Sequence, residues 1–264
     1  MMELSKLEYI AIKYVVTKHL DFCTDKYGAD RIIGIFPYGS MNYGLFDAQS
    51  DVDTYCLLAP SDNDILSMRQ ESATYEIDGG HCVVKDVRLW AKELRKGSPN
   101  ALELFVTCFG YIGNRYKRAW NNLTAATEYI ARMNKVGFIK ACVGMVMNGC
   151  YSIPYEADEE EDSTHRISGK MYVGRCRMTQ MAFKYLQGRE LKDCYRVTNK
   201  WLVNLKRKVI DIPKKFEERR EKRLLALKDI AETEELWGVR QNCDIAEQSI
   251  DNFLKTVIFS SRNS

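Results

Sequence analysis

Two aspartates separated by one residue are the first feature of the sequence that could carry chemistry. Asp51 and Asp53 lie at the start of an apolar run, residues 52–58, which is closed by Pro60 and is typical of a buried strand. Side chains alternate along a strand, so both carboxylates are expected on one face. Two neighbouring acids repel each other unless a cation lies between them, and Mg²⁺ prefers such hard oxygen ligands. The spacing therefore predicts a site for divalent ions.

A glycine and a serine precede these acids by about ten residues. Gly39 and Ser40 follow another apolar run, residues 31–36, and open a short helix. A glycine lets the backbone approach a phosphate closely, and exposed amides with a serine hydroxyl can hold anionic oxygens. Each motif alone is commonly a turn or a pair of surface acids. Together they predict a Mg-nucleotide site in which two Mg²⁺ ions, or Mn²⁺ in their place, stabilise the attacking and leaving oxygens of phosphoryl transfer.

The elements around these motifs alternate between helix and strand in the first part of the chain. Residues 4–26 have helical spacing, residues 71–77 and 82–85 form a hairpin around Asp78-Gly79-Gly80, and residues 87–96 return to helical spacing. A further helix starts at Ser98-Pro99-Asn100. The order predicts a mixed sheet.

Beyond about residue 116 the sequence is helical nearly throughout, and residues 152–169 are expected to form a mobile acidic loop. The sequence therefore predicts the α+β class, with a mixed-sheet catalytic domain at residues 1–118 and an α-helical domain at residues 119–264 that closes the nucleotide cleft. The expected helices of the second domain are residues 120–133, 135–150, 170–187, 195–210, 214–231 and 243–257.

The Gly39-Ser40 and Asp51-Val52-Asp53 motifs resemble those of the nucleotidyltransferase superfamily that includes DNA polymerase β. A closer resemblance, to the YcgL-type nucleotidyltransferases or RNA repair pathway DNA polymerase β family, extends over most of residues 30–190. It is carried by the segment KDVRLWAKELRKGSPNALELF, in which Lys85 and Ser98 replace the family's usual histidine and asparagine, and by a weaker helical segment starting at Lys170.

The resemblance implies that Asp51 and Asp53 bind the metal ions and that a third carboxylate completes the site. Asp86, at the end of the strand after the hairpin, matches this position, although it could equally cap the helix that follows. Glu76 and Glu103 are the alternatives. The implied reaction moves a nucleoside monophosphate from an NTP, ATP by default, to an acceptor hydroxyl such as an RNA end, with Asp86 assisting deprotonation of that hydroxyl.

Cations in the second half could contact the nucleotide or a nucleic acid. Lys170 and Arg177 share one face of a predicted helix and could hold the triphosphate, or could be a solvated edge. Residues 195–228 contain 12 Lys and Arg against 4 Asp and Glu, with Tyr195 and Trp201 among them. This composition is consistent with contact to RNA, but also with an ordinary charged surface.

The remaining composition narrows the class of protein. Nine scattered cysteines without a CxxC pair indicate reduced thiols in the core, and three histidines assemble no zinc spacing. The start shows no signal peptide, and no apolar run is long enough to span a membrane, so a cytoplasmic protein with no membrane partner is expected.

Three rival functions stay open. A glycosyltransferase also uses Asp-x-Asp, but it lacks a Gly-Ser in this position. A nucleotidyltransferase could instead modify a protein or a small molecule, and a non-catalytic nucleotide-binding module could keep the same motifs.

Overall fold

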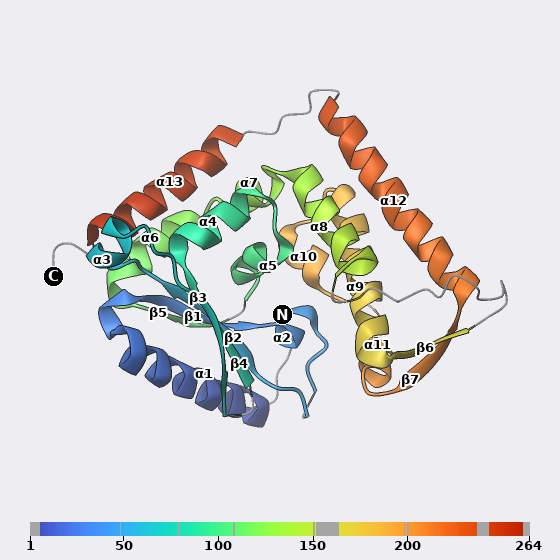
Figure 1. Ribbon diagram of the computed structural model, residues 1–264, viewed down its shortest axis with the longest axis horizontal. Coiled ribbons are helices and arrows are strands. Elements are labelled where there is room, and N and C mark those ends of the chain that lie inside the picture. Colours follow the sequence, from blue (N-terminus) through green and yellow to red (C-terminus); the bar gives the residue numbers. More distant parts are fainter. Residues whose placement is uncertain are drawn as a thin grey trace. The chain divides into compact units, whose positions relative to one another are not determined.

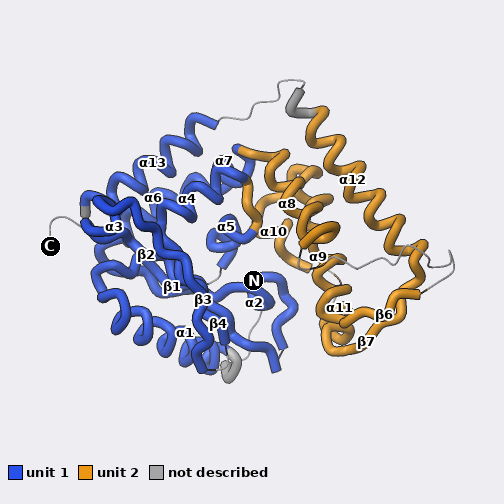
Figure 2. The backbone as a smooth tube through the Cα atoms, in the orientation of Figure 1, with its two compact units in different colours: residues 1–96, 100–133, 241–264 blue, residues 97–99, 134–240 orange. Residues whose placement is uncertain are grey.

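The computed structural model of the chain describes residues 6–47, 49–78, 80–107, 109–149, 151, 164–197, 199, 201–236 and 243–260 (Figure 1). The chain divides into two compact units: unit 1 contains residues 1–96, 100–133 and 241–264, and unit 2 contains residues 97–99 and 134–240 (Figure 2). This division differs from the predicted single boundary after residue 118. Residues 119–133 and the last helix belong to unit 1, because that helix packs on the two helices before residue 133.

A five-stranded mixed sheet is the centre of unit 1, as the α+β class requires. Its order is β3-β4-β2-β1-β5, with β2 and β4 parallel and the other neighbours antiparallel. The four predicted strands are present. The fifth, β5, has only two residues and shows no sequence pattern of its own. The strands are β1 (Ile32–Tyr38), β2 (Asp53–Leu58), β3 (Ser72–Ile77), β4 (Gly80–Asp86) and β5 (Tyr111–Ile112).

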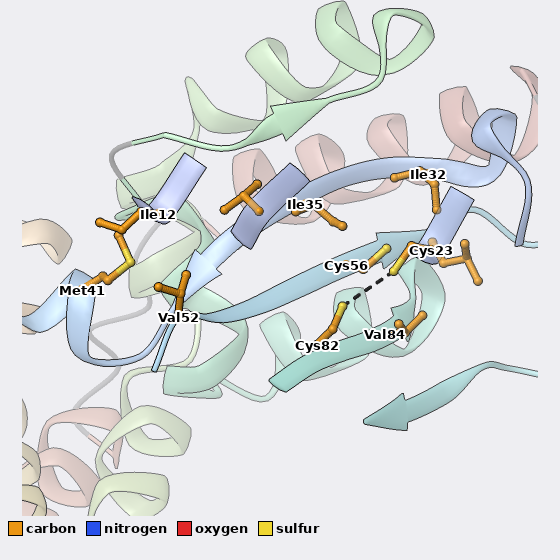
Figure 3. Packing of buried hydrophobic residues seen from close by; sticks show 11 residues of the cluster. Ile12, Cys23, Ile32, Ile35, Met41, Val52, Cys56, Cys82 and Val84 are labelled. Atoms are coloured by element: carbon orange, nitrogen blue, oxygen red, sulfur yellow. Dashed lines mark hydrogen bonds between the residues drawn. The ribbon is translucent and has the colours of Figure 1, made fainter. Parts of the chain in front are cut away.

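Helix α1 (Lys6–Tyr27) packs on one face of this sheet and buries its core there. Cys23 of the helix lies against Cys56 and Cys82 of the strands, and Ile12 lies beside Met41 at the other end of the cluster, as Figure 3 shows. Seven cysteines among the described residues are free thiols, and six of these are buried, which agrees with the expected reduced core.

Strand β2 has one face toward α1. Val52, just before it, and Cys56 belong to the core cluster with α1, and the hydroxyl of Thr54 lies 2.8 Å from Nδ1 of His19 in that helix. Because side chains alternate along a strand, Asp53 and Tyr55 point to the opposite face of the sheet.

An aromatic cluster covers part of this opposite face. Trp120 stacks on Phe36 of β1 with ring centroids 4.7 Å apart, and it also contacts Trp90 and Phe253. The helices of unit 1 beyond α1 are α2 (Ser40–Tyr43), α3 (Asp62–Leu66), α4 (Val87–Arg95), α6 (Lys117–Thr124), α7 (Thr127–Arg132) and α13 (Cys243–Ser260), and the short α5 (Pro99–Leu102) follows α4.

Unit 2 is mainly helical but contains a two-stranded sheet that the sequence analysis did not predict. The predicted helix 195–210 is only partly correct: Trp201–Leu205 is helical, but residues 206–208 are not, and Val209 begins β7, which pairs antiparallel with β6. Val209, Ile210 and Ile212 are β-branched, and such residues favour a strand when a partner strand is present. The elements of unit 2 are α8 (Lys135–Met147), β6 (Thr164–Ser168), α9 (Gly169–Leu186), α10 (Leu191–Tyr195), α11 (Trp201–Leu205), β7 (Val209–Pro213) and α12 (Lys214–Leu236).

The expected acidic loop at residues 152–169 is corrected in its last part. Residues 164–168 are β6, and Gly169 begins α9. Residues 152–163, with the four consecutive acids, lie outside the described residues.

A buried arginine connects the helices of unit 2. Arg175 of α9 is fully buried; its Nε donates to Glu217 of α12 at 2.6 Å, and its Nη2 donates to Glu221. Its Nη1 donates to the carbonyl oxygens of Val146 and Tyr151, at 2.9 and 2.7 Å. One guanidinium thus ties α8, α9 and α12 together.

A second buried charge lies at the start of α3 in unit 1. Asp64 accepts hydrogen bonds from the hydroxyl of Ser61 at 2.7 Å and from Arg31 at 2.6 Å, and Arg69 lies 2.7 Å away. Burial alone would raise the pKa of this carboxyl, but the hydrogen bonds from Ser61 and the two guanidinium groups outweigh it and lower the pKa to about 2.

We expect the Asp64→Asn variant to lose about 2 kcal/mol of unfolding free energy at pH 7. A carboxyl whose pKa is lowered by folding stabilises the protein above its unfolded pKa of about 3.9 and loses that contribution as the pH falls toward 2. Urea unfolding between pH 7 and pH 2 checks this, because wild type should lose stability below about pH 5 more steeply than the variant. Parallel curves would contradict the assignment.

Candidate functional site

The turn at Gly39 and the carboxylate of Asp53 lie together at one edge of the sheet. Tyr38, the last residue of β1, pairs with Asp53, the first residue of β2. Gly39 follows with φ +85°, a left-handed conformation that favours glycine, and a Cβ placed on it would lie 3.6 Å from Oδ2 of Asp53. The two predicted halves of the nucleotide site are therefore neighbours in unit 1.

His81 holds the other oxygen of this carboxylate. Its backbone N–H donates to Oδ1 of Asp53 at 3.0 Å, and its Nδ1 lies 3.2 Å from the same oxygen. The side chain of Asp53 is 36% exposed, and no described residue forms a hydrogen bond with its Oδ2. The sequence analysis missed His81. The signal was its place at the start of the strand after the hairpin, because parallel β2 and β4 begin at the same edge of the sheet.

The Gly39 turn is held from its other side by Glu103. The fully buried Glu103 carboxylate accepts hydrogen bonds from the backbone N–H of Gly39 at 2.6 Å, from Nδ2 of Asn42 at 2.8 Å and from the hydroxyl of Tyr43. The backbone N–H of Gly39 is therefore not among the donors that remain for a phosphate. The donors that remain for an anion are the backbone N–H groups of Ser40 and Met41 and the hydroxyl of the half-buried Ser40, because the N–H of Asn42 already donates to the carbonyl oxygen of Gly39 at 3.0 Å.

Asp51 precedes β2 instead of belonging to it. The strand starts at Asp53, and Asp51 is exposed while Val52 between them is buried. An exposed carboxylate two residues before Asp53 is free to turn toward a ligand, but the sheet does not fix its direction.

Asp86 lies at the opposite end of the sheet from Asp53. It pairs with Leu58, the last residue of β2, which is five residues or about 16 Å along the strand from Asp53. Its carboxylate caps α4 by accepting from the backbone N–H of Arg88 at 2.7 Å, and it is also paired with the Arg88 guanidinium. The structure therefore does not bring Asp86 to the site. The capping role that the sequence left open is the one observed.

Neither Glu103 nor Glu76, the two alternatives to Asp86 as third carboxylate, lies beside Asp53 as a further metal ligand. Glu103 is used by the Gly39 turn, as described above. Glu76 of β3 pairs with His81, and β4 separates it from Asp53 of β2, which puts the backbones of Glu76 and Asp53 about 10 Å apart. Among the described residues no group of three His, Cys, Asp or Glu side chains could hold a metal ion.

Tyr55 places a buried hydroxyl two residues after Asp53 on the same face of the sheet. The side chain of Tyr55 is 2% exposed, and its ring centroid lies 6.0 Å from that of Tyr38. Nζ of Lys85 lies 5.8 Å from the centroid of the Tyr55 ring. The hydroxyl has no hydrogen-bond partner in the described part of the chain, and burial raises its pKa. The site thus combines a half-exposed acid with buried aromatic side chains.

The two predicted nucleotide-binding cations of α9 do not share an exposed surface. Lys170 is exposed, whereas Arg177 is 7% exposed and its Nη2 donates to the hydroxyl of Tyr151 at 3.0 Å. Tyr195, an expected nucleic-acid contact, is 1% exposed, and its hydroxyl donates to the carbonyl oxygen of Pro99. Trp201 is exposed as expected.

No protein-family model and no curated protein matches the chain. None of the helices in the described ranges has the length and apolar character needed to cross a bilayer.

Proposed function

We propose that the chain is a nucleotidyltransferase that moves a nucleoside monophosphate from an NTP to an acceptor hydroxyl. The observation that carries the proposal is that the Gly39 turn and the Asp53 carboxylate lie side by side, because the register of β1 and β2 pairs Tyr38 with Asp53. In the transfer, the acceptor oxygen forms a bond to the α-phosphorus, the bond to the pyrophosphate oxygen breaks, and the acceptor proton is lost.

Mg²⁺ is the cofactor that this donor set suits, with Mn²⁺ as an alternative. Mg²⁺ is commonly held by one or two carboxylates together with substrate phosphates, and Asp51 and Asp53 provide such a pair. When bound, the ion would neutralise charge that develops on the phosphate oxygens. The described residues supply no third carboxylate beside Asp53, so they support one bound ion more directly than the pair expected from the sequence.

The other residues of the site have supporting roles in this proposal. His81 orients the Asp53 carboxylate through two contacts to Oδ1, which leaves Oδ2 available. Glu103 fixes the Gly39 turn so that the Ser40 hydroxyl and the backbone N–H groups of Ser40 and Met41 can donate to phosphate oxygens. These roles need no movement of the sheet, whereas the carboxylate of Asp51, which no strand fixes, would turn toward the ligand.

The position of Asp86 favours a second candidate function. A chain without a third carboxylate near Asp53 could bind a Mg-nucleotide and transfer nothing, as a sensor or regulatory module.

The test incubates the full chain with each α-labelled NTP, Mg²⁺ and a pool of RNA, protein or small-molecule acceptors. Label that appears on an acceptor and disappears with EDTA supports the transferase, and the labelled class identifies the acceptor. Mg-dependent NTP binding measured by calorimetry, without transfer to any pool, supports the second candidate. Absence of both binding and transfer overturns the proposal.

A further inference from the structure

The first half of α12 separates its charges between the inside and the outside of unit 2. Its acids Glu217 and Glu221 turn inward to the buried Arg175. Arg220 also turns inward and pairs with Glu217 at 3.1 Å, whereas most cations of the same segment remain at the surface. Those that are exposed are Lys215, Arg219, Lys222 and Arg223.

These four cations form a stripe along the helix. Lys215, Arg219 and Lys222 are spaced by four and three residues, which places them on one side of an α-helix, and Arg223 adjoins them. None of the four forms an ion pair with any described residue; in particular, Lys222 does not pair with Glu218 four residues before it. The helix also starts here, and its dipole adds positive potential. The exposed side of this segment therefore carries four cations that are not paired with any described residue.

A row of aromatic rings lies next to this stripe. The ring of Trp201 in α11 is 6.5 Å from that of Tyr172 in α9, and the guanidinium of Arg220 lies 4.8 Å from the Tyr172 ring. The same guanidinium lies 5.5 Å from the ring of Phe216 in α12. Trp201 and Phe216 are 50% and 51% exposed, so each end of the row presents an aromatic side chain to the outside.

We propose that this surface of unit 2, the cation stripe of α12 with Trp201 and Phe216, binds a single-stranded nucleic acid. Regularly spaced unpaired cations suit a phosphodiester backbone, because each contact releases condensed counterions. Exposed rings beside them suit unstacked bases, which a duplex does not offer. An anionic bilayer would use the charges equally well but would need a continuous apolar face, whereas Phe216 lies among cations.

The surface can be tested independently of the transferase site. A role of this surface in holding the acceptor strand rests on the proposed function. Binding of a single-stranded nucleic acid to the surface does not, because all residues of the surface belong to unit 2. The experiment therefore measures binding without any NTP. Wild-type binding with no transfer would leave the surface in place and overturn only the acceptor role.

The probe is a fluorescein-labelled 15-nucleotide oligouridylate, and the readout is fluorescence anisotropy of the full chain at several salt concentrations. The variant replaces Lys215, Arg219, Lys222 and Arg223 by Gln. We expect its affinity to fall at least about tenfold and the slope of log affinity against log salt to decrease by up to about 3. The double variant Trp201→Ala with Phe216→Ala should weaken binding by about fivefold or more and leave the slope unchanged.

The matched control removes four exposed cations from unit 1, by Gln substitution of Lys92, Lys96, Lys117 and Arg118. It should bind the oligonucleotide within about twofold of wild type, and circular dichroism should show all variants folded. Equal loss in the control and the α12 variant would overturn the assignment of the surface. The proposal would also be overturned if the wild-type protein did not bind the oligonucleotide, or if it bound a duplex of equal length as tightly as the single strand. Binding to phosphatidylserine vesicles but not to the oligonucleotide would overturn it as well.

Discussion

Replacing Asp53 by Asn is expected to reduce nucleotide transfer by about a hundredfold or more and to change the stability of unit 1 little. The amide keeps the size of the side chain, but it removes the negative charge that faces the Gly39 turn. Loss of one pre-organised electrostatic group at the reacting phosphate costs about 10²–10³ in rate. Initial rates of label transfer at saturating NTP measure the effect, and urea unfolding of the same preparation monitors stability. Mg-dependent NTP binding should weaken in parallel.

Asp86→Asn is the matched control, because it makes the same chemical change on the same sheet. Asn also caps helices well, so the cap of α4 should survive while the charge pair with Arg88 is lost. Transfer should stay within about threefold of wild type, and the cost should appear as reduced stability. Equal loss of transfer in the two variants would place Asp86 in the chemistry after all, and full activity of Asp53→Asn would remove the basis of the proposed function.

The contrast between these two aspartates shows what the sequence could and could not predict. The sequence predicted the strand that carries Asp53 and the Gly39 turn before it, because a short apolar run and a turn are local patterns. Which end of the sheet Asp86 occupies depends on β2 and β4 being parallel. Parallel strands begin at the same edge of the sheet, so His81, near the start of β4, lies beside Asp53 at the start of β2. Asp86, at the end of β4, therefore lies at the opposite edge of the sheet. Strand direction is a long-range property that spacing alone does not contain.

The same limit explains the error at residues 195–210. Val209 and Ile212 form a strand because residues 164–168 are available as a partner, more than 40 residues earlier in the chain. Without that partner, the apolar spacing is as consistent with a helix as with a strand. Element types were predicted well where the periodicity was long, as in α1, α9 and α12, and poorly where a short segment depends on a distant one.

Which charged side chains are buried also could not be predicted from the sequence. Residues 195–228 show their net charge in the composition, but not which acids turn inward. Arg175 pairs with Glu217 and Glu221, so these two acids do not lie among the exposed cations of α12. One buried side chain in α9 thus sets the electrostatic character of a surface on another helix.

Replacing Arg175 by Met is therefore expected to be the most destabilising single change in unit 2, with a loss of about 3–5 kcal/mol. The substitution leaves Glu217 buried without its main partner and removes the donors to the carbonyl oxygens of Val146 and Tyr151. Amide hydrogen exchange is the suitable measurement, because it reads each unit separately. Protection should fall in α8, α9 and α12, while the strands of unit 1 serve as an internal reference.

Two further variants separate charge from geometry at this position. Arg175→Lys keeps the charge but loses the planar fork, so a single ammonium cannot reach two carboxylates and two carbonyl oxygens at once, and an intermediate loss is expected. Adding Glu217→Leu to Arg175→Met should recover part of the protection, because removing both partners of a buried pair costs less than removing one. If Glu217→Leu lowered the stability of the Arg175→Met variant as much as it lowers the stability of the wild type, the two side chains would be energetically independent. Their contact would then not be what holds α9 to α12.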